Sequence, residues 1–165
     1  MGITVLRCDD RLIHGQCIVK VLNDYKIDYI ILVDAFTASN PVMSNIYKMS
    51  VPPNVHLDVA SAQSAIALIE QAEESSERTL VLVKDPIIAL KLQKNCTVLP
   101  KALNIGPMSN RKGTKKATYF SYLLDSEAAA CEELHAMEYV FISNRSRVKK
   151  KWNGKKHFSE RRIGL

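Results

Sequence analysis

The feature that most constrains the fold of this chain is its alternation of short apolar runs with longer amphipathic stretches. Runs such as Tyr29–Val33 and Thr79–Val83 have the length of a strand and are almost entirely apolar, as expected of strands buried on both faces of a sheet. Strands that alternate with helices form right-handed βαβ units. The pattern therefore predicts an α/β fold: a single domain with a mostly parallel, doubly wound sheet that helices cover on both faces.

Each expected element follows from this alternation and from the capping residues beside it. The expected strands are Ile3–Arg7, Tyr29–Val33, Val55–Val59, Thr79–Val83, Ala102–Ile105, Thr118–Leu123 and Tyr139–Ile142. The expected helices are Gly15–Asn23, Pro41–Met49, Ala62–Glu73, Pro86–Gln93 and Ser126–Met137. A side-chain oxygen just before a helix can accept a backbone N–H of its first turn. The N-caps expected on this ground are Asn40, Ser61, Asp85 and Asp125.

The positive charge of the chain is concentrated at its C-terminal end. The formal net charge is +6. From Arg145 onward there are nine Lys and Arg residues and one Glu, a net charge of +8, so the preceding residues carry a net charge of −2. We therefore divide the chain into a domain over residues 1–144 and a basic tail over residues 145–165. Such a tail can attract nucleic acid, an acidic protein face or anionic lipid, or it can simply be solvated.

Composition argues against several other classes of protein. No apolar run approaches the ~18 residues that a membrane-spanning helix needs, so we expect a cytoplasmic protein. The cysteines Cys8, Cys17, Cys96 and Cys131 form neither a CxxC pair nor a metal-ligand spacing. We expect them to be small buried apolar residues in a reducing compartment, and we expect no metal and no cofactor.

The stretch CDDRLIHGQC, residues 8–17, carries the side chains most suited to chemistry. Ligands of open α/β sheets bind beyond the carboxyl ends of the strands. The loops expected there are Asp9–His14, Asp34–Asn40, Lys84–Asp85 and Gly106–Arg111. His14 would stand just before the first helix, where free backbone N–H groups favour an anion such as a transferring phosphoryl group.

The neighbours of His14 strengthen a functional interpretation. Arg11 offers a planar set of donors that can hold phosphoryl oxygens at two points. Asp10 could accept an imidazole N–H and so determine which ring nitrogen is free to attack. Asp9 is as well suited to accepting backbone N–H bonds as to contacting substrate, and Gly15 lets a bulky group approach the backbone. Lone histidines are more often structural, the interpretation that we give to His56, His135 and His157.

The segment RCDDRLIHGQ resembles the active-site loop of IIB components of the bacterial sugar phosphotransferase system (PTS), in the mannose/fructose/sorbose class. Only Cys8 departs from that loop. The segments VPPNVHLDVAS, LVLVKDPIIALKL and ALNIGPMSNRKGTKKAT are similar to later parts of the same family, and the resemblance covers residues 2–142. The ending RSRVKKKWNGKKHFSERRIGL has no counterpart in it. This ending is either a divergent docking element or the product of a frame change in the gene.

The resemblance implies a phosphotransferase that works as a phosphohistidine carrier. A phosphorylated IIA protein would give the phosphoryl group to the loop histidine, which would pass it to a sugar bound by membrane IIC and IID components at the inner face of the membrane. The resemblance also points to a homo-oligomer and to no nucleic-acid partner. By motif, His14 is the phosphoacceptor, Arg7 and Arg11 hold the phosphate, and Asp10, Gly15 and Gln16 support the loop. Further candidates on neighbouring loops are Asp34, Lys84 and Asn104.

Two other classes of function remain as alternatives. A histidine phosphatase or mutase also uses a nucleophilic histidine followed by glycine, but it has Arg directly before that histidine, where this chain has Ile13. It also needs a second catalytic histidine. A non-catalytic protein could bind phosphate through the loop and nucleic acid through the tail. Persistence of a phosphoryl group until a sugar arrives would indicate transfer, and its spontaneous release would indicate hydrolysis.

Overall fold

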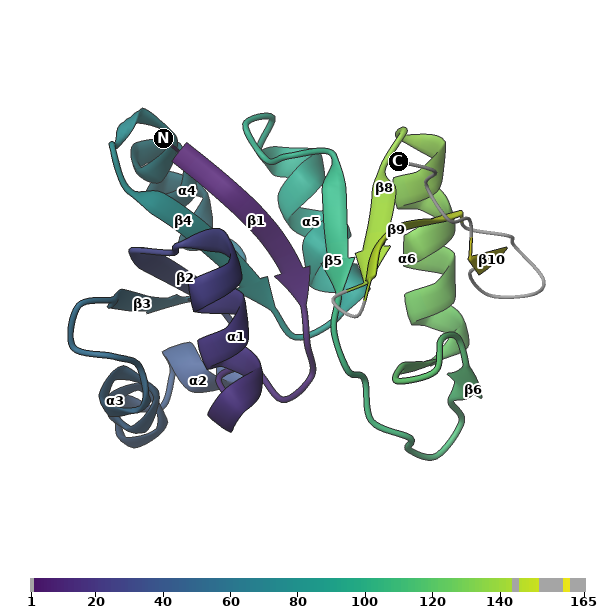
Figure 1. Ribbon diagram of the computed structural model, residues 1–165, viewed down its shortest axis with the longest axis horizontal. Coiled ribbons are helices and arrows are strands. Elements are labelled where there is room, and N and C mark those ends of the chain that lie inside the picture. The colour runs from purple at the N-terminus through teal and green to yellow at the C-terminus, as the bar shows by residue number, and fades with distance from the viewer. Residues whose placement is uncertain (1, 144–145, 152–158, 161–165) are drawn as a thin grey trace.

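The molecule is built on one large sheet whose central strands are parallel (Figure 1). The computed structural model describes residues 2–143, 146–151 and 159–160. The strands of the large sheet lie in the order β10-β9-β8-β5-β1-β4-β2-β3. Parallel pairing joins β3, β2, β4, β1, β5 and β8 in a continuous series. The predicted α/β fold with a mostly parallel sheet is confirmed.

The element boundaries agree with most of the expected ones within a few residues. The strands of the large sheet are β1 (Gly2–Cys8), β2 (Tyr29–Val33), β3 (His56–Ala60), β4 (Arg78–Val83), β5 (Ala102–Ile105), β8 (Val140–Ser143), β9 (Ser146–Lys151) and β10 (Ser159–Glu160). The helices are α1 (Gly15–Tyr25), α2 (Ala35–Ala38), α3 (Pro41–Ser50), α4 (Ala65–Glu74), α5 (Pro86–Asn95) and α6 (Asp125–Ala136). None of the described helices is long and apolar enough to cross a membrane.

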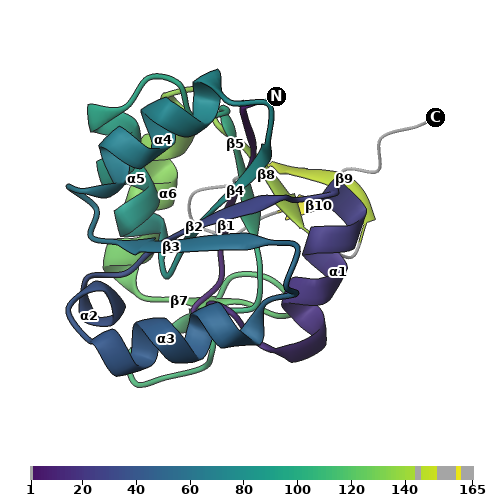
Figure 2. The ribbon, with the colours of Figure 1, turned by 90° about the vertical axis from the view of Figure 1, so that its left-hand side faces the viewer.

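Helices cover both faces of the sheet because successive side chains of a strand point to opposite sides. In β2, Ile31 and Val33 belong to the core cluster that α4, α5 and α6 complete, whereas Ile30 and Leu32 belong to the cluster that α1 completes. Figure 2 shows α4, α5 and α6 on one side of the sheet and α1 on the other. Burying each of these side chains contributes ~1.5–3 kcal/mol, which explains why the central strands are apolar throughout.

The expected strand Thr118–Leu123 is wrong in extent and in partner. Only Tyr122–Leu123 (β7) is a strand, and it pairs antiparallel with β6 (Lys115–Lys116) in a separate two-stranded sheet. The residues before it form a turn, in which the Ala117 and Thr118 N–H groups both donate to the Ser121 carbonyl at 2.8 and 3.0 Å. The whole stretch from β5 to α6 is therefore a long excursion beyond the carboxyl ends of the strands.

Short side-chain bonds account for the other differences from the expected elements. The expected loop Asp34–Asn40 contains the short helix α2, because the Asp34 carboxylate accepts bonds from both the backbone N–H and the hydroxyl of Thr37. The expected caps Asn40 and Asp85 are confirmed by bonds from Met43 N at 3.1 Å and Ile88 N at 2.9 Å.

The expected caps Ser61 and Asp125 are wrong. The hydroxyl of Ser61 accepts the Ser64 N–H at 3.2 Å in a turn that precedes α4, so that helix begins at Ala65 instead of Ala62. Asp125 is already the first residue of α6. The backbone N–H of Leu124, just before that helix, donates to the buried Glu127 carboxylate at 2.7 Å. The Ser61 hydroxyl thus serves a turn before the helix, and at α6 the Glu127 side chain takes the place of the expected cap.

The sheet continues past residue 144, where we divided the chain. Strand β9 pairs antiparallel with β8, with Phe141 opposite Lys150 and Ile142 opposite Lys149, and β10 pairs antiparallel with β9. Trp152 and Phe158, the aromatic residues of the basic tail, lie outside the described residues. The division of the chain into a domain and a tail stays a prediction.

Candidate active site

The loop between β1 and α1 is held by its two apolar residues. Leu12 and Ile13 are buried in the cluster that packs between α1 and the sheet, whereas His14 is exposed. Leu12 takes a left-handed backbone conformation with φ 54°, which costs ~1–2 kcal/mol for a residue with a Cβ. Burial of its side chain offsets this cost. The loop thus presents His14 outward at the first turn of α1.

The imidazole of His14 is left available by this arrangement. His14 is the N-cap residue of α1, with extended backbone angles, but its side chain makes no capping bond. Gly15, Gln16 and Cys17 follow in the first turn and are all exposed. The free N–H groups of that turn give the site a partial positive charge. Gly15 has φ +43°, a conformation that glycine adopts without strain.

Beneath the loop, Arg7 is fixed in a buried polar network. Arg7 and Asn104 are opposite each other in the pairing of β1 with β5, and Arg7 Nη1 donates to Asn104 Oδ1 at 2.6 Å. Arg7 Nη2 donates to Asp9 Oδ2 at 2.7 Å. Arg7 and Asp9 are only 2% and 3% exposed. A buried guanidinium is tolerated because it is paired with a carboxylate and with further hydrogen-bond acceptors.

The backbone of Gly106, the residue after β5, packs directly against this pair. A Cβ at Gly106 would lie 2.4 Å from Arg7 Nη2 and 2.8 Å from Asp9 Oδ2. The Gly106 N–H in turn donates to the Cys8 carbonyl at 2.7 Å. Glycine is therefore needed here for close approach, and not for an unusual backbone angle.

Gly106→Ala should weaken the protein by ~1–3 kcal/mol, the usual cost of forcing extra volume into a packed interior. The added methyl group must displace the Arg7 guanidinium or the backbone of β5. Urea unfolding followed by circular dichroism measures the change in the free energy of unfolding. Ser126→Ala, an exposed change near the start of α6, is the control and should stay within ~0.5 kcal/mol of the parent. Equal stability of Gly106→Ala and the parent would contradict the close packing.

Arg11 is held less rigidly than Arg7. Its side chain is 34% exposed, and its Nε lies 3.7 Å from Asp9 Oδ1. The same carboxylate oxygen accepts the Arg11 backbone N–H at 3.2 Å. Arg11 Nη2 lies 3.3 Å from Cys17 Sγ. Asp9 therefore contacts both arginines, one through a buried bond and the other through its backbone and a longer ionic contact.

The cysteines differ from one another more than the composition suggested. Cys8, Cys96 and Cys131 are buried, as expected, but Cys17 is exposed on the first turn of α1. Burial strongly raises the pKa of the Cys8 thiol, which keeps it protonated. The expectation of a buried Cys17 was wrong: this residue lies on the exposed first turn of α1, where its thiol stands beside Arg11 at the edge of a pocket instead of in the core.

Asp10 has a different partner from the expected one. Its Oδ2 accepts the Ser109 backbone N–H at 2.7 Å and lies 4.0 Å from Arg111 Nη1. Arg111 is also paired with the buried Glu127 of α6. In the described part of the chain Asp10 makes no hydrogen bond to His14. Asp10 instead ties the loop between β1 and α1 to the excursion that follows β5.

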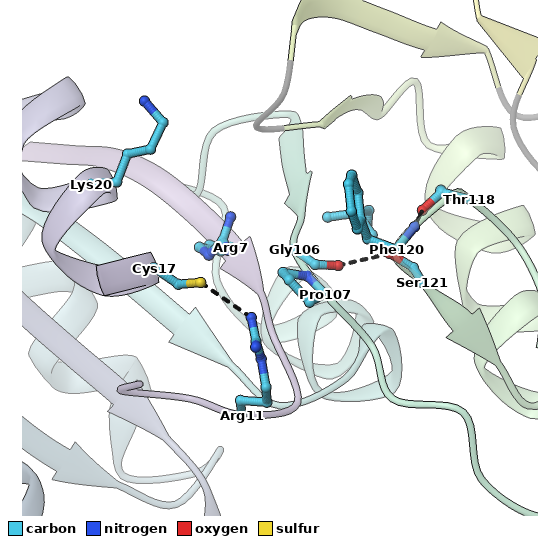
Figure 3. A pocket seen from close by; sticks show the side chains of 10 residues that line it. Arg7, Arg11, Cys17, Lys20, Gly106, Pro107, Thr118, Phe120 and Ser121 are labelled. Carbon is cyan, nitrogen blue, oxygen red and sulfur yellow. Dashed lines mark hydrogen bonds between the residues drawn. The ribbon is translucent and has the colours of Figure 1, made fainter. Parts of the chain in front are cut away.

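A pocket of about 480 Å³ opens between α1 and this excursion (Figure 3). Basic side chains and Cys17 lie on one side of it, and residues of the excursion, among them Phe120, lie on the other. Its lining consists of Arg7, Arg11, Cys17, Lys20, Ile105, Gly106, Pro107, Thr118, Phe120 and Ser121. Arg7 of β1 and Arg11 of the following loop therefore both line one cavity.

The remaining candidates are placed less centrally. Asn104 belongs to the buried Arg7 network, but Asp34 is buried as the cap of α2. Lys84 follows β4 directly and is exposed. The loop Gly106–Arg111 was expected beside the site, but the contacts that Gly106, Ser109 and Arg111 make there, and the presence of Lys20, were not foreseen from the sequence. The tertiary fold brings these residues to the site, whereas Asp9 was signalled by its place in the motif.

Comparison with known proteins agrees with this geometry. The family described as PTS system sorbose subfamily IIB component matches residues 3–162, and the chain belongs to this family. That match runs beyond residue 142, where the resemblance was expected to end. The PTS system sorbose-specific EIIB component of Lacticaseibacillus casei is 30% identical over 137 residues, which are 83% of each chain. The mannose-specific EIIAB component of Escherichia coli K12 is 25% identical over 82% of this chain and 42% of its own length.

A solved structure gives the same result. The crystal structure of the IIBSor domain of the sorbose permease from Klebsiella pneumoniae has a TM-score of 0.80 and 27% identity, covering 87% of this chain and 88% of that one. The protein is a phosphotransferase of the sorbose/mannose type that carries phosphoryl groups in PTS sugar uptake, and such components work with IIA proteins and membrane IIC and IID proteins. The phosphatase, mutase and nucleic-acid alternatives are not favoured.

Proposed function

We propose that His14 is the residue that carries the phosphoryl group. The observation that supports this assignment is the anchoring of the loop by Leu12 and Ile13, which leaves His14 exposed, without a capping bond, at the first turn of α1. The free N–H groups of that turn favour the negative charge of a phosphoryl group. Phosphoryl transfer between two nucleophiles needs position and positive potential more than covalent assistance, and this site offers both.

The two arginines have different parts in this proposal. Arg7 is a fixed donor, because Asp9 and Asn104 hold its guanidinium in place before the phosphoryl group arrives. Arg11, on the loop and partly exposed, closes on the phosphoryl oxygens with its planar set of donors. Asp10 supports the loop through Ser109, and Gly15 and Gln16 shape the first turn of α1.

The chemistry consists of two displacements at phosphorus. In the first, the lone pair of the neutral His14 imidazole, which we assign to Nδ1, forms a bond to phosphorus as the bond from phosphorus to the donor histidine breaks. In the second, a sugar hydroxyl oxygen attacks, the bond from His14 to phosphorus breaks, and the hydroxyl proton is released. We place the protein at the cytoplasmic face of the membrane, with phosphorylated IIA as donor and a sugar in the IIC and IID components as acceptor.

The fate of the phosphoryl group tests this proposal. The chain is incubated with the phosphorylated IIA protein of its transport system, separated from it, and analysed by mass spectrometry at alkaline pH, where phosphohistidine survives. We expect one added phosphoryl group, located on His14, that persists until membranes with IIC, IID and sugar are supplied. Label on another residue would reject His14 as the carrier. Spontaneous loss to water as fast as transfer to sugar would argue for hydrolysis instead.

The division of the chain at residue 144 is tested by truncation. A chain that stops at Asn144 lacks β9 and β10, so the outer edge of β8 loses its partner. We expect the melting temperature to fall by several degrees, which corresponds to a loss of ~1 kcal/mol in the free energy of unfolding for a domain of this size. The rate of phosphorylation by IIA should stay within about twofold, because the site is built at the ends of β1 and β5. Loss of folding would show that the strands after residue 144 are part of the domain.

A further inference from the structure

The excursion between β5 and α6 carries a dense set of positive charges. We call residues 109–120 the basic loop; its cations are Arg111, Lys112, Lys115 and Lys116, and it contains no Asp or Glu. Arg111 is paired with Glu127, and Lys115 Nζ lies 2.7 Å from Asp125 Oδ1. Lys112 and Lys116 are exposed and have no ion pair within the part of the chain that the structure describes. The basic loop therefore keeps an uncompensated positive charge.

Two aromatic side chains stand beside these charges. Tyr119 is 72% exposed and Phe120 is 41% exposed, and their rings form an edge-to-face pair with centroids 4.6 Å apart. Lys116 Nζ lies 5.4 Å from the centroid of the Tyr119 ring. Exposed aromatic side chains are enriched at protein interfaces, where their large rings become buried at little cost in conformational entropy.

The basic loop is built into the active site. Met108 N donates to the Phe120 carbonyl at 3.1 Å, Tyr122 N donates to the Met108 carbonyl at 3.0 Å, and the Ser121 hydroxyl donates to the Gly106 carbonyl at 2.8 Å. Gly106 in turn packs against Arg7, and Phe120 lines the same pocket as Arg7 and Arg11 (Figure 3). A protein that rests on the basic loop would thus be held next to the phosphate-binding arginines by an ordered surface.

We propose that the basic loop is the docking surface for the phosphoryl donor, and that the donor offers it an acidic face around its phosphohistidine. This inference rests on the proposed function, because it takes a IIA protein as the donor. The charges of Lys112 and Lys116 attract that face, and the ring of Tyr119 packs against it. A competing surface is the stripe of exposed apolar residues Val42, Ile46 and Met49 on α3, which carries no comparable charge.

Phosphorylation kinetics separate these surfaces. The full chain and its variants are titrated with the phosphorylated IIA protein of the same transport system, and the half-saturation concentration and maximal rate are measured. Lys112→Glu with Lys116→Glu should raise the half-saturation concentration about tenfold at low salt and much less at raised ionic strength, with the maximal rate unchanged. The control, Lys26→Glu with Lys91→Glu, makes the same charge change elsewhere on the surface. It should change the half-saturation concentration less than twofold. Tyr119→Ala should raise the half-saturation concentration several-fold at any salt concentration.

Each other outcome has a definite meaning. If the basic-loop variants are folded and labelled on His14 with the half-saturation of the parent, docking on this surface is overturned while the proposed function stands. The docking proposal is also overturned if Val42→Asp with Met49→Asp raises the half-saturation concentration and the basic-loop variants do not. It is overturned as well if the lysine changes abolish salt-dependent binding of an oligonucleotide but leave the kinetics of phosphorylation by the donor unaltered. If the parent itself is not labelled on His14, the proposed function fails, and with it the docking proposal.

Discussion

His14→Gln is expected to hold no phosphoryl group after incubation with phosphorylated IIA, whereas the parent holds one. Gln has a similar size and can hydrogen-bond, but it lacks a nucleophilic ring nitrogen, so neither displacement at phosphorus can occur. The loss should be complete within the detection limit of mass spectrometry at alkaline pH. Stability should change by no more than ~0.5 kcal/mol, because His14 is exposed and its side chain does not cap α1.

Matched changes at two other histidines test whether this loss is specific. His56 lies exposed at the start of β3 and His135 lies exposed near the end of α6, far along the chain from the loop. His56→Gln and His135→Gln should each be labelled like the parent. Full labelling of His14→Gln, or loss of label in either control, would show that the phosphoryl group is carried elsewhere.

Arg11→Lys should slow phosphoryl transfer by roughly 30- to 900-fold, which corresponds to the ~2–4 kcal/mol of transition-state stabilisation typical of one oriented donor. Lysine keeps the charge but replaces a planar set of donors with a single ammonium group. Rapid-quench measurement of label transfer at saturating donor gives the rate. The free energy of unfolding should barely change, since among the described residues the Arg11 side chain makes one sulfur contact and one long ionic contact.

Arg78→Lys makes the same chemical change at the start of β4, at the opposite end of the strands from the loop, and should leave the transfer rate within about twofold of the parent. A transfer rate of Arg11→Lys within threefold of the parent would mean that Arg11 does not hold the phosphoryl group.

Much of the fold could be predicted from the sequence because the central strands are buried on both faces. The runs Tyr29–Val33 and Thr79–Val83 have the length of strands and are apolar on both faces, as expected of strands inside a covered sheet, and they pair with each other there. Of the elements that were missed, α2 and the strand β6 with its antiparallel pairing to β7 are only a few residues long and depend on local bonds such as those of Asp34 with Thr37. Such local hydrogen bonds have alternatives of similar energy close by in the chain, so a pattern of apolar residues does not predict which of them forms.

The residues of the candidate site that belong to one short motif could be predicted from the sequence. Those that the tertiary fold brings to the site could not. Arg7, Arg11 and His14 belong to one short motif, and the structure brings the two arginines to one pocket. The importance of Gly106 depends on the registration of β5 against β1, which no local pattern encodes. The partner of Asp10 likewise depends on Ser109, almost a hundred positions later in the chain.

The pairing of Arg7 with Asn104 across β1 and β5 also bears on how the sheet assembles. If β5 slipped by one residue along β1, Arg7 would stand opposite Leu103 or Ile105, both buried and apolar. The Arg7 guanidinium would keep Asp9, two residues along the same segment, but it would lose the Asn104 acceptor, and a buried charged group that loses a hydrogen bond costs roughly 1–3 kcal/mol or more. The buried pair of Arg7 and Asn104 therefore also favours the native strand alignment during folding. A chain that folds with the wrong strand alignment would disrupt the candidate site and lose stability in the same error.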